Sequence, residues 1–225
     1  MSRMIQEANQ ETVWAEVDAY LGRELHLTDP VLEAVLAANA VAGLPAIDVS
    51  PAQGQMLALF VAVAKAERIL EIGTLGGFST ICMARALPEA GRIVTIERES
   101  VHAEVARANF ERAGLQERID LRLDAALDVL PDLEGPFDLV FIDADKPSNP
   151  FYFEWAMRLS TPGTVIIFDN VIRKGAVVDE ASLDANVQGA RAAVRLLGSD
   201  PRLKATALQT VGSKGWDGFA LAVVA

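Results

Sequence analysis

Acidic and amide side chains follow two neighbouring apolar segments of the sequence. The segment FDLVFIDADK carries Asp143 and Asp145 two positions apart, with Lys146 directly after them. If the strand persists to this point, the two carboxylates face the same way. The next apolar segment ends in Asp169 and Asn170, at the equivalent height on a neighbouring strand. Such oxygen donors suit magnesium, manganese or calcium rather than zinc, and water and substrate would complete the shell.

Electrostatic repulsion is the physical reason to expect a cation here. Adjacent carboxylates at strand ends repel each other unless a cation or a bound proton compensates. The alternative needs no metal: Asp143 caps a turn, Asp145 pairs with Lys146, and Asp169–Asn170 forms only a turn. The residues alone favour the cation and leave this alternative open.

A glycine-rich turn follows the first apolar segment of the central region, in EIGTLGGFST. Gly73, Gly76 and Gly77 allow a tight turn and let a ligand lie against the backbone. Ser79 and Thr80 can cap the following helix or donate to a carboxylate. The spacing is not G-x-G-x-x-G, which argues against a nicotinamide dinucleotide.

Glu97 ends the second apolar segment, about 20 residues beyond the glycine turn, where a carboxylate suits a ribose diol. Together, the glycine turn and Glu97 predict a pocket for an adenosine-bearing ligand without a pyrophosphate. The alternative is that Gly76 and Gly77 only allow close packing of a helix on the sheet, and that Glu97 is a solvated strand end.

The elements that must position these side chains alternate between strand and helix patterns. Such alternation, with apolar residues on both strand faces, predicts an α/β fold with a doubly wound, mostly parallel sheet. The predicted strands are Arg68–Ile72, Arg92–Glu97, Ile119–Leu123, Phe137–Ile142 and Gly163–Asp169. The predicted helices between them are Phe78–Leu87, Val101–Ala113, Ala125–Leu130 and Phe151–Leu159.

The two ends of the chain differ from this central pattern. Residues 6–42 show helical spacing, with Pro30 at a helix start, and a third helix is predicted at Ala52–Ala64. After a helix at Leu183–Leu197, the strands Leu203–Thr210 and Gly218–Val224 flank the turn-rich GSKGWD, as in an antiparallel pair. We expect one domain over residues 1–225, with residues 1–50 as a helical cap on the substrate side.

Composition excludes several classes of function. The net charge of −11 makes binding to nucleic acid or to an anionic membrane unfavourable. The polar N-terminus predicts no export, and Cys82, the single cysteine, fits a cytoplasmic protein. With only His26 and His102, a His-rich zinc site is excluded, and the chain lacks the G-x-S-x-G motif of serine hydrolases.

In ordered combination, these segments resemble the cation-dependent O-methyltransferases of the caffeoyl-CoA and catechol O-methyltransferase type. The resemblance runs from SPAQGQML at Ser50 to the end of the chain. Its markers are LEIGTLGGFST, IVTIERE, FDLVFIDADK, TPGTVIIFDNVIRKG and KGWDGFAL. It implies a Rossmann-like, seven-stranded methyltransferase sheet with a C-terminal antiparallel hairpin, and a homodimer.

The resemblance also implies S-adenosylmethionine as methyl donor and a small phenolic acceptor. The donor-site positions that match are Glu71, Gly73, Thr74, Ser79, Glu97, Ala126 and Asp145. A divalent cation, magnesium in the first place, would be held by Asp143, Asp169 and Asn170, with Lys146 as the base. Binding both hydroxyls of a vicinal diol to the cation would lower the phenol pKa. A metal-independent methyltransferase and a non-catalytic S-adenosylmethionine-binding regulator are the alternatives.

Three positions depart from the family pattern. Asp124 stands where many members have glycine, and either contacts the adenine amino group or changes the loop. Arg173 and Lys174 replace a Trp-Asn pair of the plant caffeoyl-CoA enzymes, which puts transfer of the plant substrate in doubt. The two basic residues are either solvated or meet an acidic tail of the substrate.

Overall fold

The computed structural model describes residues 2–225 of the chain, and the side chains of residues 10–225. Within these residues a seven-stranded sheet has the order β3-β2-β1-β4-β5-β7-β6. Strands β1 to β5 run parallel, whereas β7 is antiparallel to both β5 and β6. The strands are β1 Arg68–Ile72, β2 Arg92–Glu97, β3 Ile119–Leu123, β4 Phe137–Ile142, β5 Ser160–Asp169, β6 Leu203–Gly212 and β7 Gly215–Val224.

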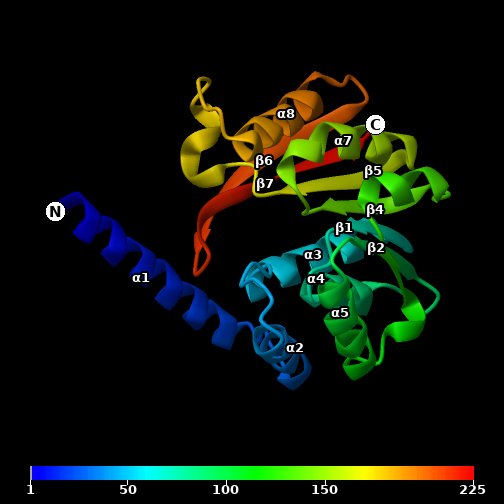
Figure 1. The fold of residues 1–225 in the computed structure, drawn as a ribbon, viewed down its shortest axis with the longest axis horizontal. Helices are drawn as coiled ribbons and strands as arrows, with labels where there is room; N and C mark the ends of the chain where they lie inside the picture. The colour runs from blue at the N-terminus through cyan, green and yellow to red at the C-terminus, as the bar shows by residue number, and fades with distance from the viewer. Residues whose placement is uncertain (1) are drawn as a thin grey trace.

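Helices connect the parallel strands and precede the sheet (Figure 1). The α-helices are α1 Ser2–Glu24, α2 Pro30–Val41, α3 Pro51–Ala64, α4 Phe78–Ala86, α5 Ser100–Arg112, α6 Ala126–Val129, α7 Asn149–Arg158 and α8 Ala185–Ser199. Short 3-10 turns are η1 Gln116–Arg118, η2 Leu130–Asp132, η3 Lys146–Ser148 and η4 Arg173–Val178. The predicted doubly wound α/β fold and the terminal antiparallel hairpin are confirmed.

Two hydrophobic clusters cover the two faces of the sheet, because successive strand residues point to opposite faces. In β4, Leu139 and Phe141 join the cluster that contains residues of α2 to α5. Val140 and Ile142 join the cluster that contains residues of α7 and α8. These four side chains are almost fully buried. Burial on both sides explains why the central strands read as continuous apolar runs.

The first two helices differ in how they meet this layered core. Asp29 caps α2, because its carboxylate accepts hydrogen bonds from the amides of Val31 and Leu32, and Pro30 occupies the first turn as predicted. Helix α2 packs Val35 into the core, whereas α1 projects away from the body of the molecule (Figure 1). Among the described residues, the helices are too short or too polar to cross a membrane.

Element bounds differ from the predictions mainly at the ends. The fifth strand begins at Ser160 rather than Gly163, and the last two strands extend through Gly212 and from Gly215. Register shifts between Phe137 and Leu139, where β4 pairs with β5, mark an irregular start of that pair. Ser160 is only partly buried and Thr161 and Pro162 are exposed, so they lack the apolar signal that reveals a buried strand.

Candidate active site

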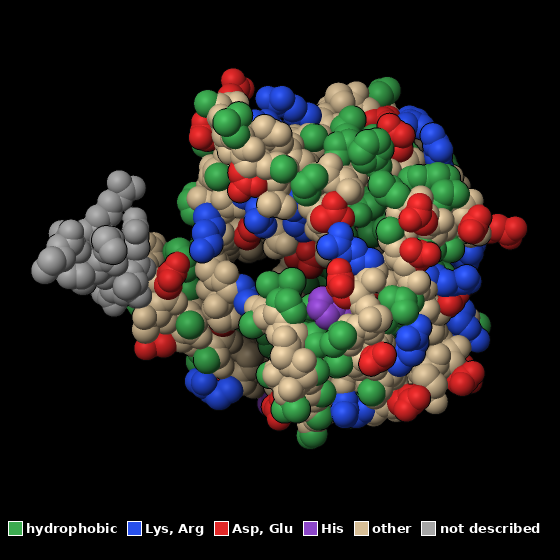
Figure 2. Space-filling view, viewed as in Figure 1, with side chains coloured by type: hydrophobic (Ala, Val, Ile, Leu, Met, Phe, Trp, Pro, Cys, Tyr) green, Lys and Arg blue, Asp and Glu red, His purple; other side chains and the backbone are tan. Residues whose placement is uncertain are grey.

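The carboxyl ends of the parallel strands surround a cavity of about 650 Å³. Figure 2 shows a hollow near the middle of this face of the molecule, with acidic and basic side chains at its rim. Most of the residues predicted for the site line the cavity: Gly73, Thr74, Ser79, Glu97, Ala126, Asp143, Asp145, Lys146 and Asn170. Glu71 and Asp169 are buried behind this lining. Doubly wound sheets bind ligands at this edge.

Gly73 brings the glycine turn against the end of β4. Its φ of +99° lies in the region that favours glycine, and a Cβ atom there would stand 2.2 Å from the carbonyl oxygen of Asp143. The amide of Asp143 in turn donates to the carbonyl of Ile72. The glycine turn and the acidic segment therefore meet across neighbouring strands, as their positions in the sequence predict.

Glu71 is fully buried and accepts hydrogen bonds from three hydroxyl groups. Ser79 Oγ lies 2.6 Å from Oε1, and Thr80 and Thr95 lie 2.5 and 2.6 Å from Oε2. Thr74 Oγ1 lies 2.6 Å from the Thr95 hydroxyl, which extends this chain to the cavity wall. Burial raises the pKa of Glu71 to about 7, although the three hydroxyl groups lower it. Of the two predicted roles of Ser79 and Thr80, the structure shows donation to a carboxylate.

Glu97 ends β2 and presents its carboxylate to the cavity. Its Oε2 accepts a hydrogen bond from the Leu75 amide at 2.8 Å, and its Oε1 accepts one from the Glu99 amide at 2.9 Å. His102 Nδ1 lies 3.5 Å from the same Oε1. Backbone amides from both sides thus fix the carboxylate, and its remaining lone pairs can accept the hydroxyl hydrogens of a diol.

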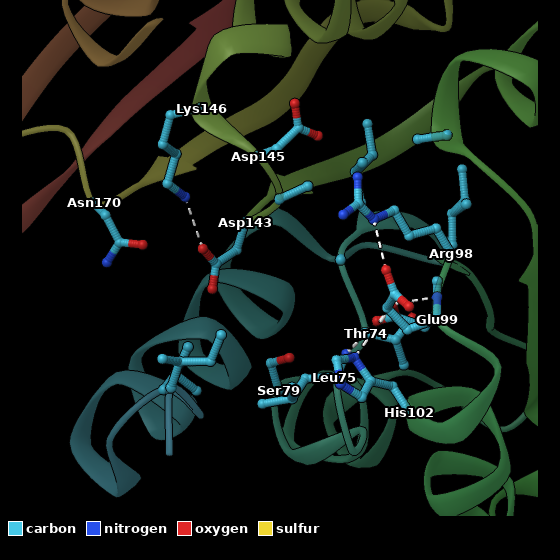
Figure 3. Close-up of a pocket in the computed structure, with 18 of the residues that line it drawn as sticks. Thr74, Leu75, Ser79, Arg98, Glu99, His102, Asp143, Asp145, Lys146 and Asn170 are labelled. Carbon is cyan, nitrogen blue, oxygen red and sulfur yellow. Dashed lines mark hydrogen bonds and ion pairs between the residues drawn. The ribbon is translucent and has the colours of Figure 1, made fainter. Parts of the chain in front are cut away.

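Lys146 and Asp143 form an ion pair at the other end of the cavity (Figure 3), with Lys146 Nζ 2.9 Å from Asp143 Oδ1. Lys146 is only 6% exposed. Helix α8 packs closely behind it, because a Cβ atom at Gly189 would lie 1.9 Å from the Lys146 carbonyl oxygen. The alternative pairing of Lys146 with Asp145 is not what the structure shows.

Asp169 ends β5 and is only 4% exposed. Its Oδ1 accepts a hydrogen bond from the Asn170 amide at 2.8 Å, and its Oδ2 accepts one from Gln53 Nε2 at 2.6 Å. Burial, and then the charge of Asp143, raise the pKa of Asp169, although Lys146 lowers it. Two carboxylates therefore lie near enough to repel each other in a poorly solvated place.

Asp145 was expected to face the same way as Asp143 if the strand persisted to this point, and the strand does not persist. The strand ends at Ile142, and Asp145 is the N-cap residue of the 3-10 turn η3, so its carboxylate points away from Asp143 (Figure 3). Tyr152 OH donates to Asp145 Oδ1 at 2.6 Å, and Ser148 Oγ donates to Oδ2 at 2.5 Å. Tyr152 carries no signal in the sequence that marks it as a site residue, yet it lines the cavity from helix α7.

The oxygen atoms at the charged end suit a divalent cation. Asp143 and Asp169 follow Ile142 and Phe168, which are partners in the register of β4 and β5. Asn170 lines the same end of the cavity (Figure 3). Among the described residues, no three His, Cys, Asp or Glu side chains are grouped to hold a metal ion. The predicted set of ligands has only two carboxylates, those of Asp143 and Asp169. It therefore needs the side-chain amide oxygen of Asn170 as a third donor, and hard cations accept such an oxygen.

The three positions that depart from the family pattern lie in different surroundings. Asp124 is exposed at the cavity, and its carboxylate accepts a hydrogen bond from the following amide, that of Ala125, at 2.8 Å. Arg173 Nη1 lies 3.8 Å from Asp217 Oδ2, so this half-buried arginine has a partner within the chain. Lys174 is exposed and does not line the cavity.

Sequence analysis left several cavity residues unidentified. Ile47, Asp48 and Val49 line the cavity from the segment between α2 and α3, which is where a contribution of the N-terminal region was expected. Arg98, directly after β2, and Asn186, in helix α8, also line the cavity. Arg98 lies within the marker IVTIERE, whereas the other four residues belong to no motif, and only the three-dimensional arrangement brings them to the site.

Known proteins resemble this chain in sequence and in fold. A family model described as O-methyltransferase matches residues 25–223. The chain is 53% identical to a catechol O-methyltransferase of Mycobacterium tuberculosis, over 93% of this chain and 95% of that one. It is 50% identical to a catechol O-methyltransferase of Niastella koreensis, over 94% and 98%. The crystal structure of the O-methyltransferase from Bacillus cereus in complex with SAH is 54% identical and superposes with a TM-score of 0.93, over 95% and 99%. The chain therefore belongs to the O-methyltransferase family.

Proposed function

We propose that this protein transfers a methyl group from S-adenosylmethionine to one hydroxyl of a small vicinal diphenol, with the help of a divalent cation. One observation carries the proposal. A single cavity joins a carboxylate fixed for a diol, Glu97, to a charged end that contains Lys146, Asp143 and Asn170. The two relatives named catechol O-methyltransferase support the acceptor class, and the SAH complex of the Bacillus cereus structure supports the donor.

The donor occupies the glycine-turn half of the cavity in this proposal. Glu97 accepts hydrogen bonds from the ribose hydroxyls, and the backbone at Gly73 and Thr74 lies against the methionine part. Ser79 and Glu71 support the turn from beneath through their hydrogen bond of 2.6 Å. Ala126 contacts the adenine, and Asp145, fixed by Tyr152 and Ser148, accepts from the donor's amino group. All but Glu71 of the predicted donor-site positions line the cavity.

The charged half of the cavity orients and deprotonates the acceptor. Asp143, Asp169 and Asn170 would hold the cation, which supplies Lewis acidity toward the hydroxyl oxygens when bound. Lys146 Nζ acts in its neutral amine form and takes the proton of the reacting hydroxyl, and Asp143 stabilises the ammonium group that results. The oxygen then attacks the methyl carbon: a C–O bond forms, the C–S bond breaks, and sulfur keeps the electron pair. Fixing both reactants at attack distance contributes several kcal/mol to the rate.

Methyl transfer to a panel of acceptors tests this proposal. Labelled methyl groups are followed from S-adenosylmethionine to vicinal diphenols and to matching monophenols, each with magnesium and with a chelator. We expect transfer to the diphenols alone, and its loss with the chelator. Transfer that ignores the chelator would remove the cation from the proposal. Donor binding without transfer to any diol, under varied metals, would instead favour a non-catalytic binding protein.

We also propose that the chain acts as one domain, in the cytoplasm, and as a homodimer. The two hydrophobic clusters lie on opposite faces of one sheet, which supports a single folding unit. The lone Cys82 is buried and reduced, as the cytoplasm favours. Val13, Val17 and Tyr20 are each about half exposed on the projecting helix α1, and a second copy would cover such apolar side chains. Analytical ultracentrifugation tests the dimer directly.

A further inference from the structure

Gln53 makes a contact that its local sequence does not predict. It is the third residue of α3, and its backbone amide donates to the hydroxyl of the N-cap residue Ser50 at 3.2 Å. In the pattern Ser-x-x-Gln, the glutamine side chain usually turns back to the amide of the N-cap residue. Here Gln53 Nε2 instead lies 2.6 Å from Oδ2 of Asp169, which is 116 positions away in the chain.

This contact completes the fixation of the Asp169 carboxylate. The Asn170 amide holds one oxygen and Gln53 holds the other, so rotation of the carboxylate would break a hydrogen bond on either side. Each carboxylate oxygen has a second lone pair, so both remain able to bind a cation. An amide donor is also neutral: it satisfies a buried oxygen without cancelling the charge that a cation requires.

We propose that Gln53 is a positioning residue that fixes the Asp169 carboxylate and thereby sets the affinity of the cation site. The inference rests on the proposed function, because it requires that Asp169 binds a divalent cation. Partners that orient a metal ligand from outside typically contribute 10- to 100-fold to metal affinity. Gln53 also joins the site to the cavity wall, because Ile47, Asp48 and Val49 lie just before its helix and line the cavity.

Manganese binding, measured without donor or acceptor, tests this inference. Gln53→Met keeps the length and helix propensity of the side chain and removes its amide, and Gln53→Ala is a second variant in case the first packs badly. Gln55→Met is the matched control, because Gln55 is exposed two residues further along the same helix. Asp169→Ala removes the ligand itself. Isothermal titration calorimetry and the electron paramagnetic resonance spectrum of free manganese give the Kd. Circular dichroism checks the fold.

We expect the Kd for manganese to rise at least tenfold in both Gln53 variants. Gln55→Met should bind as the unchanged chain does, and Asp169→Ala should lose binding. Equal Kd values for the Gln53 variants and the unchanged chain, with binding lost in Asp169→Ala, would overturn the inference and leave the proposed function intact. An equal loss in Gln55→Met would also overturn it, since the effect would then be a general one of α3. If the unchanged chain binds no divalent cation, the cation and the inference fall together.

Discussion

Lys146 Nζ lies 2.9 Å from Oδ1 of Asp143, which stands three residues earlier in the chain. Asp143 follows strand β4, and Lys146 begins the 3-10 turn η3, which helix α8 supports. The pair therefore places an amine and a carboxylate at one point of the cavity wall. In the proposed reaction, the amine receives a proton and the carboxylate stabilises the charge that forms.

Lys146→Met should lower kcat by about 10²- to 10⁴-fold, the usual contribution of a positioned base. The Kd for manganese should not rise. Removing a positively charged neighbour lowers the electrostatic repulsion that a bound cation experiences. Methyl transfer to a diphenol, measured between pH 6 and 9, checks the first point. Lys204→Met, at an exposed position of β6, is the matched control. An unchanged rate at every pH would assign the proton to another base.

Asp169→Ala should abolish cation-dependent transfer while leaving the fold. The substitution removes a buried carboxylate that the charge of the half-buried Asp143 disfavours, so the cost to stability is small and the effect falls on the cation. Initial rates with increasing magnesium, followed by addition of a chelator, measure the effect. Full activity of this variant in the presence of the chelator would contradict the assignment of Asp169.

Glu97→Gln should weaken donor binding about tenfold, because hydrogen bonds to a charged group contribute about 1.5 to 3 kcal/mol. The new amide group would also face the backbone amide of Leu75 or of Glu99, both of which donate to the carboxylate now. Titration calorimetry with S-adenosylhomocysteine gives the Kd. Glu104→Gln, at an exposed position of α5, should bind as before. Equal affinity of both variants would remove Glu97 from the donor site.

The central strands were predictable because burial on both faces demands apolar residues throughout. The predicted bounds of β1 to β4 agree with the structure, although β3, at the edge of the sheet, is mostly not buried. The positions of the carboxyl ends of these strands and of β5 follow from the predicted bounds. These ends give the approximate places of Gly73, Glu97, Asp143 and Asp169. Contacts between distant segments left no comparable signal. The Gln53–Asp169 hydrogen bond joins residues 116 positions apart.

The direction of Asp145 shows a second limit of sequence analysis. A period of two holds only while the strand continues, and here the strand ends at Ile142, three residues before Asp145. The hydroxyl groups of Ser148 and Tyr152 then determine where the carboxylate points. Neither partner belongs to the motif that carries Asp145, so the motif alone could not show its direction.

Stability should fall as pH rises, in part because of Glu71. The pKa of this carboxyl group is about 7 in the folded chain, against an ordinary value of 4.5. The folded state therefore keeps a proton that the unfolded state loses. This contribution is complete below pH 4.5 and is lost as pH rises through about 7, at a cost of about 3 kcal/mol.

Urea unfolding at pH 5, 6, 7 and 8 tests this pH dependence in Glu71→Gln. The free energy of unfolding of this variant should depend less on pH than that of the unchanged chain, and the difference isolates Glu71 from other titrating groups. Glu117→Gln changes an exposed carboxylate and should keep the full dependence. Parallel curves for Glu71→Gln and the unchanged chain would show that Glu71 titrates alike in both states.

Gly189→Ala should impair catalysis from outside the cavity. A Cβ atom at this position would lie 1.9 Å from the carbonyl oxygen of Lys146 and 2.3 Å from its carbonyl carbon, so either α8 or η3 must move. Overpacking of this kind costs about 1 to 3 kcal/mol of stability. Displacing the base by about 1 Å can reduce the rate about 100-fold. We therefore expect a lower melting temperature and a kcat reduced at least tenfold.

Gly198→Ala is the matched control, because it lies on the same helix and a Cβ atom there would meet nothing within 4 Å. Alanine is the better helix former, so this variant should be as stable as the unchanged chain or more stable, with unchanged kcat. Thermal unfolding and initial rates on both variants separate a helix effect from a contact effect. If Gly189→Ala kept its full kcat while its melting temperature fell, the close approach of α8 would support the fold without positioning Lys146.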